Sequence, residues 1–173
     1  MTAPVLIAFG GLPGTGKTTV ARAVAASLSA AYLRIDTIEQ ALRASGMLAG
    51  DVGPAGYLVG YAQAEANLRL GLMVVADSVN PLAVTRDAWR GAAVAARATL
   101  LEVELTCSDK AEHRRRVEER DMDVPGLARP TWQSVLDRKY EPWDRPRLLL
   151  DTAHISVAAA ADMVQQALAR PLP

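Results

Sequence analysis

The residues between positions 5 and 28 limit what this chain can fold into more than any other part of it. An uninterrupted apolar run at 5–9 is followed at once by a glycine-rich octapeptide, and the octapeptide by an alanine-rich stretch with valines four residues apart. The octapeptide fits the pattern G-x-x-x-x-G-K-[ST] and consists of Gly11, Leu12, Pro13, Gly14, Thr15, Gly16, Lys17 and Thr18. A buried strand, a glycine loop and a helix in succession are the context that this pattern needs, so the sequence predicts a phosphate-binding P-loop.

Each residue type in the octapeptide has a physical reason to be there. Glycines tolerate backbone angles that a Cβ would forbid, which lets consecutive N–H groups point into one concavity. The following helix adds its unpaired N–H groups and the positive end of its dipole. We expect Lys17 to reach the β- and γ-phosphates of a nucleoside triphosphate, Thr18 to hold Mg²⁺, and Thr19 to belong to the same nucleotide-binding set.

Helical and strand patterns alternate along the rest of the chain, which is typical of an α/β protein with a doubly wound parallel sheet. Strands are predicted at 5–9, 32–35, 72–76, 99–106 and 148–150. In 99–106, apolar residues alternate with Glu102 and Glu104, so we expect this strand to be half exposed and near an edge. The glycine- and proline-rich segment 49–56 is predicted to be a loop.

Length, charge and cysteine content exclude several classes of protein. The 173 residues fit one domain, 1–173, and Lys plus Arg equals Asp plus Glu at 19 each. A chain with no net charge lacks the basic footprint of a protein that grips nucleic acid without sequence preference. The single Cys107, the lack of a signal-peptide pattern and the lack of a membrane-length apolar run predict a cytoplasmic protein without a membrane partner. A monomer and a homodimer both fit the sequence.

Three acidic residues end predicted strands, and ligands of parallel α/β sheets bind outside the carboxyl ends of the strands. We expect Asp77 to assist Mg²⁺ and Asp36 to accept the proton of an attacking hydroxyl. The alternative for both is a carboxylate that caps the next helix. Asp151 is predicted to shape a turn near the nucleotide base.

An arginine-rich helical segment ends in a stretch without periodicity. Arg116 and Arg120 are four residues apart and share a helix face. One interpretation is a mobile lid that brings Arg120, and next Arg116, to the transferring phosphoryl group. The alternative is a solvent-exposed helix that is stabilised by two ion pairs, Glu112 with Arg116 and Arg115 with Glu119.

Several further residues near these segments have two interpretations each. Arg86 either holds an anionic group of an acceptor or is exposed on its helix. A helix is predicted from Thr131 to about Tyr140, and the aromatic residues Trp132, Tyr140 and Trp143 either wall an acceptor pocket or pack in the core. The two histidines have no neighbours at metal-ligand spacing, and no role is predicted for them.

With these residues in place, the chain resembles the small P-loop kinases related to nucleoside monophosphate kinases. This group contains gluconate kinase, adenylylsulfate kinase, chloramphenicol phosphotransferase and many "AAA family ATPase" kinases of similar length. The resemblance covers about 4–170 and rests on 10–18, on Asp36, on Asp-Ser-Val-Asn at 77–80 and on the arginine-rich helix. It implies a five-stranded parallel sheet in order 2-3-1-4-5 with helices on both faces, ATP with Mg²⁺, and an arginine-bearing lid at about 112–131. It also implies transfer of the γ-phosphoryl group to an acceptor.

One departure from that family concerns the acceptor. Many relatives carry D-x-x-R after the second strand, with the arginine on an acceptor anion, whereas here the run is Asp36-Thr37-Ile38-Glu39. An acid in that place favours a neutral or cationic small-molecule acceptor, with Arg43 as the candidate substitute for the arginine. The leading hypothesis is therefore an ATP-dependent kinase that phosphorylates a hydroxyl group of a small molecule. The alternatives are a nucleotide or nucleic-acid-end kinase and a nucleotide-dependent switch.

Overall fold

A parallel sheet forms the centre of the protein in the computed structural model, which describes residues 4–48 and 50–170. The strands are β1 (Val5–Gly10), β2 (Ala31–Arg34), β3 (Val74–Asp77), β4 (Thr99–Thr106) and β5 (Leu148–Asp151). Their order is β2-β3-β1-β4-β5, and every neighbouring pair is parallel, which confirms the predicted topology. Because all strands run the same way, their carboxyl ends meet along one edge of the sheet.

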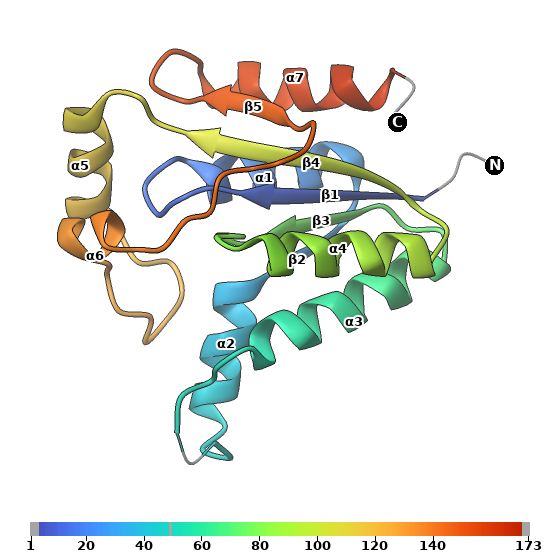
Figure 1. Cartoon of the computed structure of the whole chain (residues 1–173), viewed down its shortest axis with the longest axis horizontal. Coiled ribbons are helices and arrows are strands. Elements are labelled where there is room, and N and C mark those ends of the chain that lie inside the picture. Colours follow the sequence, from blue (N-terminus) through green and yellow to red (C-terminus); the bar gives the residue numbers. More distant parts are fainter. Residues whose placement is uncertain (1–3, 49, 171–173) are drawn as a thin grey trace.

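Helices cover both faces of the sheet and its carboxyl edge. Their bounds are α1 (Lys17–Leu28), α2 (Ile35–Ala44), α3 (Ala55–Arg69), α4 (Ala83–Ala95), α5 (Lys110–Glu118), α6 (Trp132–Leu136) and α7 (Val157–Leu168). Helices α1 and α7 pack against one face and α3 and α4 against the other. Helices α5 and α6 lie beyond the carboxyl ends of the strands (Figure 1). None of the helices among the described residues is both long enough and apolar enough to cross a membrane.

The core explains why β1 is apolar at every position. Successive side chains of a strand point to opposite faces of the sheet. Ile7 and Phe9 therefore pack with α1 and α7, and Leu6 and Ala8 pack with α3 and α4. All four side chains are at most 2% exposed. A strand that is covered on both faces has no polar side. The continuous apolar run at 5–9 therefore correctly predicted a strand buried on both faces of the sheet.

The prediction that the strand at 99–106 is half exposed is wrong, although β4 does lie next to the edge strand β5. Strand β4 pairs with β1 on one side and β5 on the other, and both of its glutamates are buried. Arg90 Nη2 lies 3.2 Å from a Glu102 carboxylate oxygen, and Arg147 Nε lies 2.6 Å from a Glu104 oxygen. Burial raises the pKa of Glu102. The alternation of acidic and apolar residues thus reflects buried ion pairs, not exposure to solvent.

Three predicted boundaries shift in ways that matter for the site. Strand β2 ends at Arg34, so Asp36 lies in the first turn of α2 and not at a strand end. Helix α6 ends at Leu136, short of the predicted Tyr140, because the chain then crosses to β4, where the Tyr140 hydroxyl lies 3.2 Å from Glu104. The predicted loop at 49–56 gives way to α3 at its end, and its first residue, at position 49, lies outside the described residues.

Candidate active site

The P-loop joins β1 to α1 in a conformation that two of its glycines make possible. Gly14 and Gly16 have φ angles of 85° and 81°, in the left-handed region that side chains disfavour. A Cβ at Gly14 would also lie 2.5 Å from Val117 Cγ2 of α5. Gly16 is the N-cap of α1, and because glycine has no side chain, the first-turn N–H groups of that helix receive no cap from it. These N–H groups are therefore available to an anion.

Buried hydrogen bonds hold the start of the P-loop in place. The Gly11 N–H donates to the Val79 carbonyl at 3.0 Å, and the Asn80 side-chain amide donates to the Phe9 carbonyl at 2.9 Å. The Trp89 indole N–H donates in turn to the Asn80 side-chain oxygen at 3.0 Å. Asn80 is fully buried with a φ of 49°. No role was predicted for it, although an asparagine can adopt this conformation more readily than most residues.

A cavity of about 430 Å³ opens beside the P-loop. Basic side chains outnumber acidic ones among its lining residues, which makes it suited to a polyanion. The lining residues are Gly14, Gly16, Lys17, Thr18, Thr19, Arg22, Arg115, Arg116, Glu119, Arg120, Asp121 and Asp123. Of the predicted nucleotide-binding residues, those from Gly14 to Thr19 except the buried Thr15 line this cavity, and both predicted arginines lie beside them. We call this space the phosphate cavity.

Lys17, which lines the phosphate cavity, pairs with the buried carboxylate of Asp77. Lys17 Nζ lies 3.7 Å from Asp77 Oδ1, and the Tyr32 hydroxyl donates to Asp77 Oδ2 at 2.7 Å. Burial and the neighbouring Asp77 carboxylate raise the pKa of Tyr32, so its hydroxyl stays a donor at neutral pH. A hydroxyl at Thr18 and a carboxylate at Asp77 are oxygen ligands that suit Mg²⁺ together with phosphate oxygens and water. Tyr32 was missed because nothing near it in the sequence points to Asp77.

A second cavity, of about 300 Å³, lies on the other side of Lys17. Asp36 and Glu39 of α2 line it, together with Arg43, Tyr57 of α3 and residues of the loop that follows α5. The Asp36 side chain is 39% exposed and makes no capping hydrogen bond to α2, so the capping alternative is wrong for it. We call this space the acceptor-side cavity.

Glu39, which occupies the position of the arginine in the D-x-x-R pattern, forms an ion pair in the wall of the acceptor-side cavity. Arg43 Nη2 lies 3.3 Å from Glu39 Oε2, one turn of α2 away. The Glu39 side chain also packs against the backbone of Gly56, where a Cβ would overlap with it. Burial raises the pKa of Glu39. Arg43 therefore enters the cavity with its charge already compensated.

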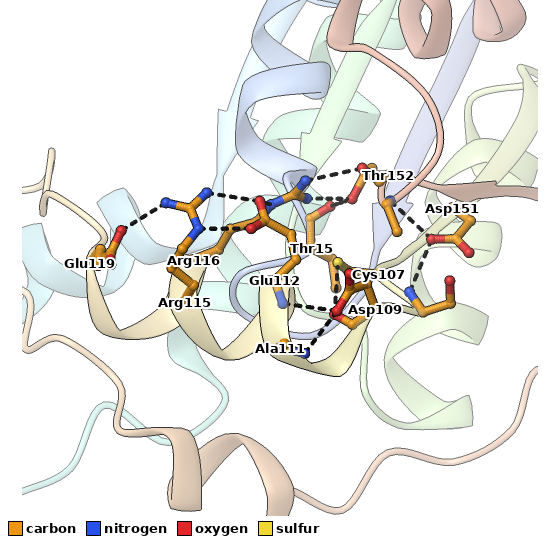
Figure 2. Close-up of polar contacts among 12 residues, drawn as sticks. Thr15, Cys107, Asp109, Ala111, Glu112, Arg115, Arg116, Glu119, Asp151 and Thr152 are labelled. Carbon is orange, nitrogen blue, oxygen red and sulfur yellow. Dashed lines mark hydrogen bonds and ion pairs between the residues drawn. The ribbon is translucent and has the colours of Figure 1, made fainter.

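Helix α5 is tied to the P-loop through Arg116. The Arg116 Nη1 group donates to Thr152 Oγ1 at 2.8 Å, and Nη2 donates to the Thr152 carbonyl at 3.1 Å (Figure 2). Thr152 Oγ1 donates in turn to the Thr15 carbonyl at 2.9 Å. His113 Nε2 lies 2.8 Å from the Pro13 carbonyl oxygen, a second contact that was not predicted. Two side chains of α5 thus reach the P-loop backbone.

The predicted alternative for the arginine-rich helix is also present. Glu112 with Arg116 and Arg115 with Glu119 form ion pairs of 2.7 Å each. Hydrogen bonds from Arg115 and Arg116 lower the pKa of Glu112 to about 2. Arg120 follows the helix and lines both the phosphate cavity and the acceptor-side cavity. The movement of 112–131 as a lid stays a prediction.

The sequence matches a family model over residues 6–139, which is more than half of the chain, and that model describes an AAA domain, AAA_33. The chain belongs to this AAA domain family. Together with the P-loop geometry, this membership confirms the predicted class of small P-loop proteins. A search of curated protein sequences gives no significant match.

Solved structures of three P-loop proteins share the fold of this AAA-family chain over nearly all of its length. APS kinase CysC of Mycobacterium tuberculosis, solved with AMPPNP and APS, is 23% identical with a TM-score of 0.74, covering 98% of this chain and 100% of its own. A gluconokinase from Sinorhizobium meliloti is 20% identical with a TM-score of 0.62, covering 98% of each chain. Kti12 of Chaetomium thermophilum, solved with ADP-AlF3, is 23% identical with a TM-score of 0.62, covering 95% of this chain and 100% of its own.

Both interpretations of Arg86 are wrong. Its side chain is 1% exposed and donates to the carbonyls of Glu141 and Pro142 at 3.0 and 3.1 Å. Its guanidinium also lies 4.7 Å from the centre of the Trp143 ring. Arg86 therefore anchors the segment before β5, where Trp143 packs in the core and does not line the acceptor-side cavity. The core interpretation holds for Trp143.

Asp151 and the remaining aromatic residues have structural contacts of their own. Asp151 Oδ1 accepts the N–H groups of Ser108 and Ala153 at 3.0 and 3.1 Å, so it shapes a turn as predicted. The Ser108 hydroxyl and N–H lower the pKa of Asp151. Trp132 packs edge-on against the His113 ring, with 5.1 Å between ring centres. These contacts lie beside the carboxyl ends of β4 and β5.

Replacing Thr152 with valine is expected to destabilise the AAA-family chain by about 1–3 kcal/mol, because the buried acceptors at Thr15 and Thr106 and the Arg116 guanidinium lose one shared hydroxyl. Urea unfolding followed by circular dichroism measures this change. Thr37→Val, on the exposed side of α2, is the matched control and should change stability by less than about 0.5 kcal/mol. Equal unfolding midpoints for the two variants would contradict the bridging role of Thr152.

Proposed function

We propose that this chain is an ATP-dependent phosphotransferase that transfers the γ-phosphoryl group to a hydroxyl of a small molecule. One observation carries the proposal: Lys17 and Arg120 line both the phosphate cavity and the acceptor-side cavity. A triphosphate in the first cavity and a hydroxyl in the second would meet between these two cations. Phosphoryl transfer depends mainly on such positioning and on charge stabilisation.

The nucleotide half of the site is supported by three features. The P-loop backbone and Lys17 surround the phosphate cavity, where the triphosphate would lie. A neighbouring cavity of about 350 Å³ begins at Gly16 and Thr19 and continues along Thr152, Ile155 and Val157. Its partly apolar wall suits the base and ribose. Mg²⁺, held through Thr18 and Asp77, would neutralise phosphate charge.

The chemistry assigned to the chain's own residues is a single displacement. The acceptor oxygen bonds to the γ-phosphorus while the bond from that phosphorus to the β–γ bridging oxygen breaks, and ADP leaves. The proton of the acceptor hydroxyl passes to the Asp36 carboxylate, which lines the acceptor-side cavity and is partly open to solvent. Lys17 and Arg120 stabilise the charge that moves onto the leaving oxygen.

The walls of the acceptor-side cavity favour a neutral or cationic acceptor. Arg43 is the residue nearest in sequence that could replace a missing anion-binding arginine, and it pairs with Glu39 at 3.3 Å. Asp36 and Glu39 present two carboxylates from the same helix to the cavity. An acceptor that carries its own anionic group would have to displace Glu39 from Arg43, and it would meet Asp36 as a like charge.

A panel of acceptors tests this assignment. We expect ADP formation with polyols, sugars or amino alcohols to exceed that with nucleoside monophosphates. Glu39→Gln should raise KM for the accepted compound about 10- to 100-fold, which corresponds to one charge-assisted hydrogen bond. Glu65→Gln removes the same kind of i, i+4 partner, from Arg69 on α3, and should leave KM unchanged. Faster turnover of a nucleoside monophosphate than of every uncharged or cationic acceptor would contradict the assignment.

A further inference from the structure

Arg34, the last residue of β2, is a buried arginine that contacts carboxylates from three separate elements. Its guanidinium lies 2.7 Å from Asp123 Oδ2, 3.4 Å from Asp36 Oδ2 and 3.8 Å from Asp77 Oδ2. Its side chain is only 2% exposed. Asp36 belongs to α2, Asp77 to β3, and Asp123 to the loop after α5. No sequence pattern singled out Arg34 or Asp123.

Asp123 brings the loop after α5 to this arginine. Its Oδ2 atom also lies 2.7 Å from Arg22 Nη2 of α1, and its Oδ1 atom lies 3.8 Å from Arg120 Nη2. The hydrogen bond from Arg34 holds the pKa of Asp123 at about 2, so the carboxylate is charged at neutral pH. Asp123 thus links the loop that carries Arg120 to the edge of the sheet.

Burying a guanidinium is costly, and most of that cost is recovered only where its donors are paired. Arg34 Nε, which faces Asp77, has no hydrogen-bond partner within the described part of the chain. Arg86, the other buried arginine of that part with an unpartnered Nε, donates to two backbone carbonyls and lies near no carboxylate assigned to the reaction. The planar fork of Arg34 instead faces the two carboxylates assigned to proton transfer and to Mg²⁺.

We propose that Arg34 is a positioning residue for phosphoryl transfer. It fixes Asp36 relative to Asp77, and its ion pair with Asp123 joins the placement of both carboxylates to the placement of Arg120 over the phosphates. This inference rests on the proposed function. It assigns Arg34 no contact with ATP or acceptor, because the side chain lies beneath the carboxylates and lines neither cavity.

Arg34 and Arg22 both pair with Asp123 Oδ2, and a comparison of variants at these two arginines tests the proposal. Arg34→Met should lower kcat by about 100-fold, the cost of misplacing reacting groups by about 1 Å, while the dissociation constant of ATP-Mg²⁺ changes less than about threefold. Arg22→Met removes the other 2.7 Å partner of Asp123 Oδ2 but leaves Asp36 and Asp77 untouched. Because Arg22 lines the phosphate cavity, this variant should weaken ATP-Mg²⁺ binding, while kcat at saturating ATP falls much less than in Arg34→Met. A structural role alone would lower the melting temperature and leave kcat per folded molecule unchanged.

A third variant keeps the test decisive if Arg34→Met does not fold. Asp123→Asn removes the charge of a loop residue and should lower kcat in the same direction, and the Arg34→Lys variant should recover part of the lost kcat. Where Arg34→Met does fold, the double-mutant cycle adds a further check, because Asp123→Asn should have little additional effect in that background. Unchanged kcat in Asp123→Asn and Arg34→Lys overturns this inference alone. A wild-type protein that binds ATP-Mg²⁺ but phosphorylates no acceptor overturns it together with the proposed function.

Discussion

Replacing Lys17 with alanine is expected to abolish the stabilisation of the protein by ATP-Mg²⁺. Wild-type protein at an ATP concentration 100 times the dissociation constant should gain about 2.7 kcal/mol of unfolding free energy. The variant should gain none, since Lys17 is the P-loop lysine that lines the phosphate cavity and is proposed to contact the phosphates. Differential scanning calorimetry with and without ATP-Mg²⁺ measures the effect, and transfer should be lost along with binding.

The fold should survive this substitution, because Asp77 keeps the hydrogen bond from Tyr32 and the neighbouring charge of Arg34. Lys110→Ala is the matched control, since Lys110 is an exposed lysine at the start of α5 and lies outside the cavities described above. A second arm uses GTP, which we expect not to shift the wild-type melt. Stabilisation of the Lys17 variant by ATP equal to that of wild type would rule out the P-loop as the triphosphate site.

Replacing Asp36 with asparagine should separate nucleotide binding from transfer. The side chain keeps its shape but can no longer accept the acceptor's proton, which should lower kcat about 10²- to 10⁴-fold. The melting shift with ATP-Mg²⁺ should remain, because Asp36 lines the acceptor-side cavity and not the phosphate cavity. Coupled detection of ADP, with the best acceptor of the panel, measures the rate.

Asp162→Asn is the control for this variant, because Asp162 is exposed on α7, far along the chain from both cavities. Its kcat should equal that of wild type. Normal transfer by Asp36→Asn would show that another group takes the proton, and it would remove the main reason to place the acceptor beside α2. Loss of the ATP shift in the same variant would point to a folding defect instead.

The features that could be predicted from the sequence are those that depend on a short run of consecutive residues. The P-loop is eight consecutive residues between a buried strand and a helix, and the order of the strands followed from the resemblance that this motif anchors. Asp77 ends its strand beside Lys17 as expected, since the carboxyl ends of parallel strands share an edge. Such local signals need no knowledge of distant partners.

The errors concern side chains whose partners lie far away in the sequence. Arg86 could not be recognised as buried, because the carbonyls that accept its hydrogen bonds are more than fifty residues further on. The alternation of acidic and apolar residues in β4 was interpreted as exposure for the same reason, since Glu104 is paired with Arg147, which immediately precedes β5. Arg34 and Thr152 were missed outright. A charged residue can be stabilised either by solvent or by an oppositely charged residue far away in the sequence. The local sequence pattern is the same in both cases, so it does not show whether the residue is exposed or buried.

The phosphate cavity and the acceptor-side cavity have only Lys17 and Arg120 in common among their lining residues. Under the proposed function, mutations in those walls of the second cavity that lie outside the P-loop can therefore accumulate without weakening nucleotide binding. A protein built in this way can exchange one substrate for another by changing a few residues of α2, α3 and the loop after α5. This separation also suggests a way to change the substrate of the proposed kinase. A library of variants at Glu39, Tyr57 and Leu127 would alter the acceptor-side cavity and leave the residues around the phosphate cavity unchanged.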